Sequence, residues 1–199
     1  QYLKENKGLL ESRERGKWKH DRWYAFGRSQ NLAEMEQQKI LTPSIANRAS
    51  FSLDIDDFFY FVGSGGGGGG GYGVTISPQQ RISYQYLLGL LNSTLLDKFL
   101  KSYSSPFSGG YFAFNRQYIE LLPIRTIDFS NKIDSQLHNK MVQLVETMLK
   151  LHRSLSNLSP SDQQTVNKQI EATDREIDRL VFQLYDLTNG EIEIIQSDE

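Results

Sequence analysis

The chain has 199 residues and is nearly neutral, with 22 Lys and Arg against 24 Asp and Glu and a pI of about 6.0. Its 38% hydrophobic content is enough for a buried core, and no apolar run approaches the roughly 18 residues of a membrane helix. With no cysteine and three histidines, the chain has no disulfide, thiolate zinc site or cysteine nucleophile, so we expect cytoplasmic globular domains without a membrane partner.

Charge and pattern divide the chain into two predicted domains, residues 1–125 and 126–199. The first carries 15 basic and 11 acidic residues, and the second carries 7 and 13. The basic excess lies in residues 1–48, which is typical either of a solvated surface or of a nucleic-acid-binding face. The chain begins at Gln1 without a signal pattern, so we interpret it as part of a longer protein.

Residues 1–125 have the pattern of a mixed helical and extended domain. Hydrophobicity predicts a helix over 1–14, strands over 39–45, 51–55, 58–62 and 73–77, and extended segments over 111–114 and 118–124. A long helix is expected from Pro78 onward, broken near Asn92-Ser93. Because strands and helices do not alternate regularly, the fold class is α+β rather than a doubly wound nucleotide-binding sheet.

An unbroken run of seven glycines spans Gly65 to Gly71. It is not a P-loop, because Tyr72-Gly73-Val74-Thr75 follows where Lys-Ser/Thr is needed. Two interpretations stay open. The run is a flexible hairpin connection or inserted linker, or it is a loop that orders against DNA phosphates with Tyr72 at its base.

Residues 126–199 have the clearest helical pattern. Apolar residues recur at spacings of three and four, first at Ile133, Leu137, Met141, Leu144, Met148, Leu151, Leu155 and Leu158, and again from Val166 to Leu187. Between the two runs, Ser159 is suited to an N-cap and Pro160 to the first helical turn. We expect an antiparallel helical hairpin with a solvated face that includes Asp174, Arg175, Asp178 and Arg179.

No catalytic motif is recognisable. The histidines are not placed near a Gly-x-Ser-x-Gly elbow, so a serine triad is not indicated. Asp54, Asp56 and Asp57 form a small acidic cluster, for which we favour charges on an edge strand over a metal site, because the nearest lysine, Lys39, is not in a nuclease-like arrangement. We therefore expect neither catalytic nor metal-binding residues.

Several segments together resemble the TaqI-type C-terminal specificity domain of adenine-specific DNA methyltransferases and type IIG restriction enzymes. They are Trp23 to Leu32, Lys39 to Ile45, Tyr86 to Ser93 with its Leu-Leu-Asn-Ser sequence, and Gly110-Tyr111 leading to Leu121-Leu122-Pro123-Ile124. The end of the chain, Ile177 to Thr188 followed by Glu191-Ile192, is similar to the helical tails of those enzymes.

The resemblance implies a non-catalytic target recognition domain that binds double-stranded DNA and presents an adenine to a separate methyltransferase domain. That family's Asn-Pro-Pro-Tyr motif and its S-adenosylmethionine motif are absent from these residues. The chain itself is therefore expected to hold no cofactor. S-adenosylmethionine, with Mg as a further candidate, belongs on the rest of the parent enzyme, an adenine-specific DNA methyltransferase for which endonuclease activity is an open question.

Candidate DNA-contacting residues combine cations with short polar side chains. Phosphate contacts are assigned to Arg28, Arg48, Lys101 and Arg116. Base edges or groove walls are assigned to Ser29, Gln30, Ser104, Ser105, Ser108 and Tyr111, together with Tyr72 beside the glycine run. Two alternatives stay open: a protein docking module that uses the heptad-like hairpin, and the specificity subunit of a type I restriction system.

Overall fold

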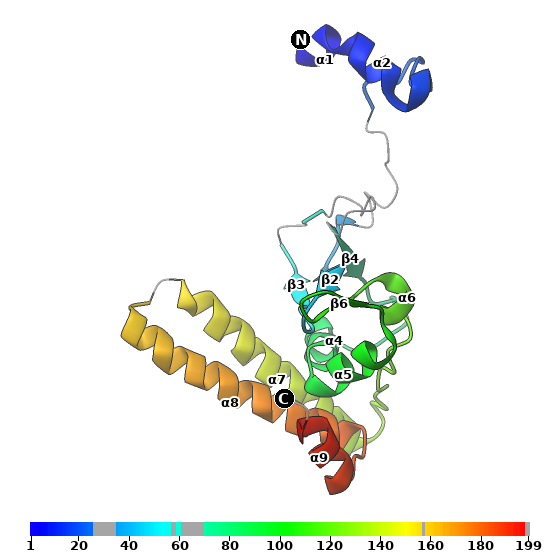
Figure 1. Ribbon diagram of the computed structural model, residues 1–199. Coiled ribbons are helices and arrows are strands. Elements are labelled where there is room, and N and C mark those ends of the chain that lie inside the picture. Colours follow the sequence, from blue (N-terminus) through cyan, green and yellow to red (C-terminus); the bar gives the residue numbers. More distant parts are fainter. Residues whose placement is uncertain (26–34, 57–58, 61–69, 157, 198–199) are drawn as a thin grey trace. The chain divides into compact units, whose positions relative to one another are not determined.

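The computed structural model of the protein describes residues 1–25, 35–56, 59–60, 70–156 and 158–197 (Figure 1). The chain divides into two units, Gln1–Glu34 and Met35–Glu199. Of the strand predicted over 58–62 the structure describes only residues 59–60, which are not in a strand, and most of the glycine run lies outside the described residues. Within the described part, no helix combines the length and the apolar character needed to span a bilayer.

The first unit contains two short helices, α1 (Tyr2–Glu5) and α2 (Lys7–Gly16), which confirms the helix expected over 1–14. Helix α2 is interrupted near its end, where Glu14 and Arg15 have positive φ angles. The Arg13 guanidinium donates to the carbonyl of Trp23 at 2.7 Å and lies 4.4 Å from the centre of the Trp18 ring. Arg13 thereby holds the turns that follow α2 against the helix.

The second unit contains two small antiparallel sheets. In the first, β1 (Lys39–Pro43) lies between β3 (Ser52–Asp54) and β4 (Gly71–Val74). In the second, β6 (Tyr111–Ala113) lies between β2 (Ile45–Ala46) and β5 (Pro106–Phe107). The strands expected over 39–45 and 51–55 and the extended segment expected over 111–114 are thus confirmed with shorter extents, whereas the strand expected over 73–77 begins two residues earlier and ends at Val74.

Ser44 links the two sheets. It separates β1 from β2, its backbone N–H donates to the Gly70 carbonyl at 3.0 Å, and its carbonyl accepts from Phe114 at 2.9 Å. One continuous stretch of chain therefore contributes a strand to each sheet. The register Ile45↔Ala113 and Ala46↔Phe112 places the residues after β2 beside the β5–β6 hairpin.

Three helices follow β4: α4 (Tyr84–Leu91), α5 (Thr94–Tyr103) and α6 (Arg116–Ile119). The break near Asn92-Ser93 is confirmed, because the Ser93 hydroxyl accepts from the Leu96 N–H and caps α5. The expected start at Pro78 is wrong: the first helix begins after Ser83, whose hydroxyl accepts from Tyr86. The extended segment expected over 118–124 is also wrong, since its first residues belong to α6.

The C-terminal part forms the antiparallel hairpin of α7 (Lys132–Leu155) and α8 (Pro160–Leu184), followed by the unexpected short helix α9 (Asn189–Ser197) (Figure 1). The Ser159 hydroxyl accepts from the Asp162 N–H and Pro160 occupies the first turn, as predicted. Ile133 is 63% exposed, so its assignment to the seam is wrong. With these helices beside the small sheets, the predicted α+β class is confirmed.

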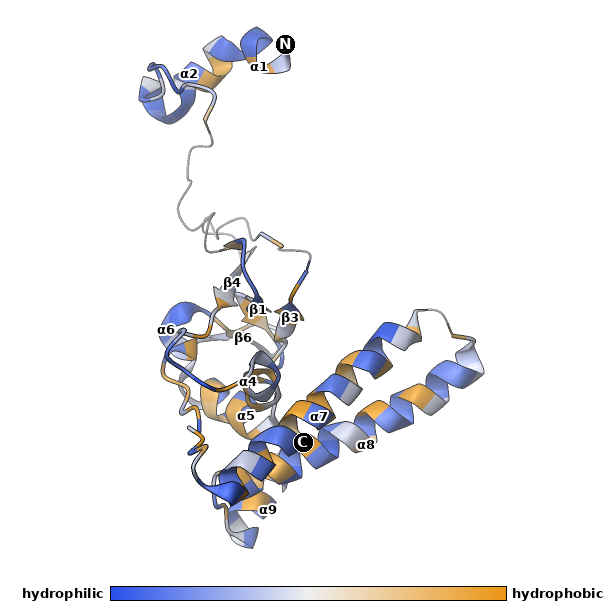
Figure 2. Ribbon diagram, turned by 180° about the vertical axis from the view of Figure 1, so that it is seen from behind, coloured by the Kyte–Doolittle hydropathy of each residue, from blue (hydrophilic) through white to orange (hydrophobic). Residues whose placement is uncertain are grey.

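The hydrophobic core of the second unit is centred on α4. Residues Tyr86 to Leu91 of this helix are all buried, since β1 and β3 of the first sheet, α5 and α7 pack around it. The core side of α7 is close to α4 at Gly89, where an added Cβ would lie 3.0 Å from Val145 and would clash with Met141. Hydrophobic residues gather along α4 and α5 and along α7 and α8 (Figure 2).

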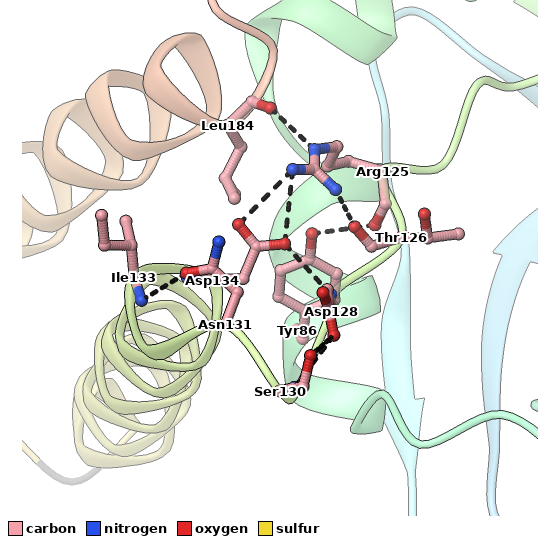
Figure 3. A network of polar contacts seen from close by, with 9 residues as sticks. All are labelled: Tyr86, Arg125, Thr126, Asp128, Ser130, Asn131, Ile133, Asp134 and Leu184. Atoms are coloured by element: carbon pink, nitrogen blue, oxygen red, sulfur yellow. Dashed lines mark hydrogen bonds and ion pairs between the residues drawn. The ribbon is translucent and has the colours of Figure 1, made fainter.

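A polar network fixes the hairpin to the core (Figure 3). The Arg125 side chain donates to the Leu184 carbonyl at 3.2 Å and forms an ion pair with Asp134 at 3.4 Å. The carbonyl of Arg125 accepts from the Tyr86 hydroxyl at 2.9 Å, and Asp134 also accepts from the Asp128 N–H. One arginine thus connects α4, α7 and α8. The domain boundary expected after residue 125 stays a prediction.

Candidate nucleic-acid interface

The sheet formed by β2, β6 and β5 gathers several of the predicted contact residues. Arg48 is exposed and lies two residues after the end of β2, which pairs with β6. Ser105, Ser108 and Tyr111 are exposed on the β5–β6 hairpin or directly before it. The tertiary structure therefore brings together a cation, two hydroxyl side chains and a phenol from segments about 60 residues apart in the sequence.

Helices α5 and α6 provide the two other described cations of the predicted set. The Arg116 side chain is 84% exposed and its ion pair with Glu120, at 3.1 Å, is in contact with solvent. Such an exposed pair contributes little to stability, so Arg116 can exchange its partner for a phosphate at small cost. The Lys101 side chain is 23% exposed, paired with Asp97 at 2.6 Å and situated over the Phe112 ring.

Asp97 is a supporting residue that the sequence did not reveal. One carboxylate oxygen accepts from Lys101 Nζ, and the other accepts from the backbone N–H of Ala49 at 2.6 Å. Because Ala49 directly follows Arg48, this contact fixes the backbone that carries the exposed guanidinium. The signal in the sequence was the acidic residue in the first turn of a helix, which gives no indication of its distant partner.

The Tyr103 and Tyr118 side chains form a chain of contacts that ends at Ser105, directly before the β5–β6 hairpin. The Tyr103 hydroxyl donates to the Tyr118 carbonyl at 2.8 Å, and the Tyr118 hydroxyl lies 2.6 Å from Ser105 Oγ. Burial raises the pKa of the Tyr103 phenol above its ordinary value. The Ser105 hydroxyl is therefore held in place while the residue remains exposed.

The other predicted contact residues are not exposed on this sheet or are not described. Tyr72 is half-buried and lies in β4 of the first sheet, where it pairs with Thr42 of β1. Ser104 is 7% exposed, directly after α5, and among the described atoms its hydroxyl has no hydrogen-bond partner. Arg28, Ser29 and Gln30 lie outside the described residues. The predicted contact residues that the structure places on or next to the β2-β6-β5 sheet are therefore Arg48, Lys101, Ser105, Ser108, Tyr111 and Arg116.

The interpretation of the acidic cluster as surface charges needs correction at Asp54. This residue is 4% exposed and its carboxylate lies 2.5 Å from Lys39 Nζ, while Lys39 is fully buried. The same carboxylate oxygen accepts from the Phe59 N–H at 2.7 Å. The pair Lys39↔Asp54 is in register between β1 and β3, so the edge strand is fixed to the sheet by a buried ion pair.

Asp178 also differs from its predicted place on the solvated face of the hairpin. Its carboxylate accepts from the Thr94 N–H at 2.9 Å and from the Thr94 hydroxyl at 2.6 Å. Thr94 is the first residue of α5, so Asp178 stabilises the N-terminus of that helix from α8. Its neighbours Asp174, Arg175 and Arg179 are exposed, as expected.

The Asn92-Ser93 pair has a structural role. The Asn92 amide accepts from the Phe51 N–H at 2.9 Å and donates to the Phe51 carbonyl at 3.0 Å. It therefore satisfies both backbone groups of the residue before β3, as a neighbouring strand would. The adjacent Ser93 caps α5, and the two residues together define the turn between α4 and α5.

The exposed groups around the β2-β6-β5 sheet are chemically suited to binding DNA. Within the ranges that the structure describes, no three His, Cys, Asp or Glu side chains are grouped in a way that could hold a metal ion. The exposed guanidinium groups can neutralise phosphates, and the hydroxyl groups of the hairpin can donate to and accept from base edges. The surface is therefore chemically complementary to a polyanion with hydrogen-bonding edges.

Comparison with known proteins gives two findings. The model of a family described as the TaqI-like C-terminal specificity domain matches residues 1–124. The type II restriction enzyme and methyltransferase RM.Eco57I of Escherichia coli is 29% identical over 173 residues, which cover 86% of this chain. The matched region is 17% of the Escherichia coli protein, so the chain corresponds to a small part of that relative.

Proposed function

The chain belongs to the TaqI-like C-terminal specificity domain family, and from this premise we propose that it recognises a specific sequence in double-stranded DNA for a DNA methyltransferase of a type IIG-like restriction-modification enzyme. The family match carries the proposal. The grouping of exposed cations and hydroxyls around the β2-β6-β5 sheet supports it, because these groups suit phosphates and base edges respectively.

In this proposal the chain contributes binding and the parent enzyme contributes the chemistry. S-adenosylmethionine, and Mg if the parent also cleaves DNA, are held by other parts of the parent. The target adenine is flipped out of the helix toward that catalytic domain. The chain's own residues fix the register of the DNA through phosphate contacts and discriminate its sequence through the β5–β6 hairpin.

The α7–α8 hairpin is proposed to brace the recognition surface against the catalytic body of the same enzyme. Arg125 fixes the start of α7 and the end of α8 to α4. Asp178 fixes α8 to the start of α5. Farther along, the seam residues Leu151, Leu155 and Val166 are only half-buried. This end of the hairpin therefore retains apolar surface for a neighbouring domain.

The test is a selection of the purified chain against random duplex DNA, followed by affinity measurements at low and high salt. Arg48→Ala and Arg116→Ala should weaken binding to all sequences and reduce the salt dependence by about one charge each. Ser108→Ala should leave the salt dependence unchanged and relax the sequence preference. Lys150→Ala, an exposed cation on α7, is the matched control and should change neither.

A salt-sensitive affinity without any enriched sequence would mean that readout requires the catalytic domain. No binding at low salt would contradict the proposal and favour the second candidate, a protein docking module that uses the half-buried end of the α7–α8 seam. Loss of affinity in Lys150→Ala but not in Arg48→Ala would likewise contradict the proposed surface.

A further inference from the structure

Two aromatic rings are exposed side by side on the β5–β6 hairpin. Phe107 is 48% exposed and Tyr111 is 45% exposed, and the strand register pairs them directly. Directly opposed residues of antiparallel strands project from the same face, with their Cβ atoms about 5 Å apart. Among the described residues, neither ring takes part in the hydrophobic core. The hairpin thus presents an apolar aromatic surface that its own fold does not use.

The turn that carries the rings has a defined conformation. Gly109 and Gly110 have φ angles of +79° and +76°, a backbone conformation that residues other than glycine rarely adopt. The Tyr111 ring lies against Gly109, where an added Cβ would be 3.6 Å from its Cδ2 atom. The backbone bond from Ala113 to the Ser105 carbonyl, at 3.0 Å, closes the base of the hairpin. The two rings are therefore presented by a closed hairpin.

The surroundings of the rings favour a nucleic acid over an apolar protein surface. Arg48 follows two residues after β2, the strand that pairs with β6, the strand of Tyr111. The exposed Arg116 follows three residues after β6. An aromatic surface flanked by cations is the combination with which proteins stack on bases and contact the backbone at the same time.

We propose that Phe107 and Tyr111 form a stacking site for bases that have lost their stacking neighbours in the bound DNA. The inference rests on the proposed function, which requires that one base leave the helix, and it assigns to this chain the residues that stabilise the opened duplex. Aromatic or apolar side chains inserted next to unstacked bases replace the lost base stacking. Phe107 and Tyr111 are positioning residues in this scheme.

The experiment compares two duplexes that contain the sequence enriched by the selection: one fully paired, and one with a single abasic position opposite an unpaired base. The complete 199-residue chain should bind the opened duplex about tenfold more tightly than the paired one. Phe107→Leu and Tyr111→Leu keep apolar bulk but remove a ring, and each should reduce that preference to about twofold or less. Tyr111→Phe should retain it, because stacking does not need the hydroxyl.

The matched control is Phe99→Leu, which removes another exposed ring, 42% exposed, from α5. It should retain the full preference for the opened duplex. Thermal unfolding of each variant establishes that the fold is intact, and because each leucine variant removes one ring on its own, either of them keeps the test decisive if the other fails to fold.

The possible results distinguish failure of the stacking site from failure of the proposed DNA-recognition function. Absence of binding to either duplex at low salt would contradict the proposed function. Tight binding to paired DNA with no preference for the opened duplex would overturn the stacking site alone, as would a preference that survives Phe107→Leu and Tyr111→Leu. Loss of the preference in Tyr111→Phe would indicate a hydrogen bond from the phenol instead. Capture of a protein with no DNA binding would favour the docking alternative.

Discussion

Single polar side chains connect distant parts of the second unit, and Asn92 is a clear case. Its amide satisfies both backbone groups of Phe51, which lies 41 residues away in the chain. Phe51 is 7% exposed, so water cannot readily replace the amide. The consequence is that the Leu-Leu-Asn-Ser sequence fixes the start of β3, in the β3-β1-β4 sheet, to the end of α4.

Asn92→Ala should therefore destabilise the protein by about 1–3 kcal/mol, because a buried N–H and a buried carbonyl lose their partners. Urea unfolding followed by circular dichroism measures the change. Asn167→Ala, at an exposed position on α8, is the matched control and should shift the free energy of unfolding by less than about 0.5 kcal/mol. Equal urea midpoints for Asn92→Ala and Asn167→Ala would show that the Asn92 contacts contribute nothing to the free energy of unfolding.

Buried tyrosines make the stability sensitive to high pH. Burial raises the pKa of both Tyr86 and Tyr185 above the ordinary value of 10.0. The folded state therefore retains protons that the unfolded state loses. Their contribution to stability is fully present below about pH 10 and is lost as pH rises further, by up to about 1.4 kcal/mol per group per pH unit.

Tyr86→Phe should reduce this alkaline loss of stability. The variant lacks the bond from the hydroxyl to the Arg125 carbonyl, so it is less stable near neutral pH. Its free energy of unfolding should nevertheless fall less steeply between about pH 10 and 11.5, because one titrating group is gone. Urea unfolding across this pH range measures how steeply the free energy of unfolding falls with pH in the original chain and in Tyr86→Phe. Equal slopes would contradict a contribution of Tyr86 to the alkaline loss of stability.

At the scale of elements, the closeness of α4 and α7 depends on one glycine. At Gly89 an added Cβ would meet Met141 and Val145, and Met141 is fully buried. Gly89→Ala should gain about 1 kcal/mol in helix propensity but lose about 1–3 kcal/mol to overpacking, a net destabilisation. Gly190→Ala in α9, where no atom lies within 4 Å of the added Cβ, is the control and should unfold no more easily than the original chain.

The contact from α8 to α5 offers a second test at this scale. Asp178→Asn weakens two hydrogen bonds to Thr94 and removes a charge that stabilises the start of α5. We expect a loss of about 1–3 kcal/mol in the free energy of unfolding. Glu171→Gln, at an exposed position two turns earlier in α8, should have little effect. Similar thermal midpoints for both variants would exclude a stabilising role for the contact.

Across the second unit as a whole, burial in the hairpin is uneven. The buried residues of α7 lie between Asp134 and Val145, and those of α8 lie between Ile177 and Leu184. The remaining turns, on both sides of the connection at Ser159, have seams that are only half-buried. Local stability should therefore decrease along the hairpin away from α4 and α5.

Hydrogen exchange followed by mass spectrometry should resolve this gradient. Peptides from residues 148–173 should exchange faster than peptides from 134–145 and 177–184, because fewer buried contacts oppose their local opening. Uniform protection along both helices would contradict the expectation. If the proposed bracing role is correct, the catalytic domain should slow exchange in 148–173 specifically.

The sequence by itself determined the elements whose signals are local. The three-and-four spacing predicted α7 and α8, Ser159 and Pro160 predicted the start of α8, and segments rich in Ile, Leu, Val and Phe located β1 and β3. Each of these signals acts within a few residues, where backbone geometry and side-chain period are coupled. The same short segments, taken in order, supported the resemblance to a specificity domain that the family match confirms.

Only the tertiary structure decided which polar residues are structural and which are exposed. Asp178 meets Thr94 across 84 residues, and Asp54 is buried with Lys39 although its sequence context suggested a surface charge. It likewise placed Arg48 beside the β5–β6 hairpin and Tyr72 in the other sheet. A charged or hydroxyl side chain has the same local pattern whether it meets solvent or a distant partner, and only the packing of remote segments distinguishes the two.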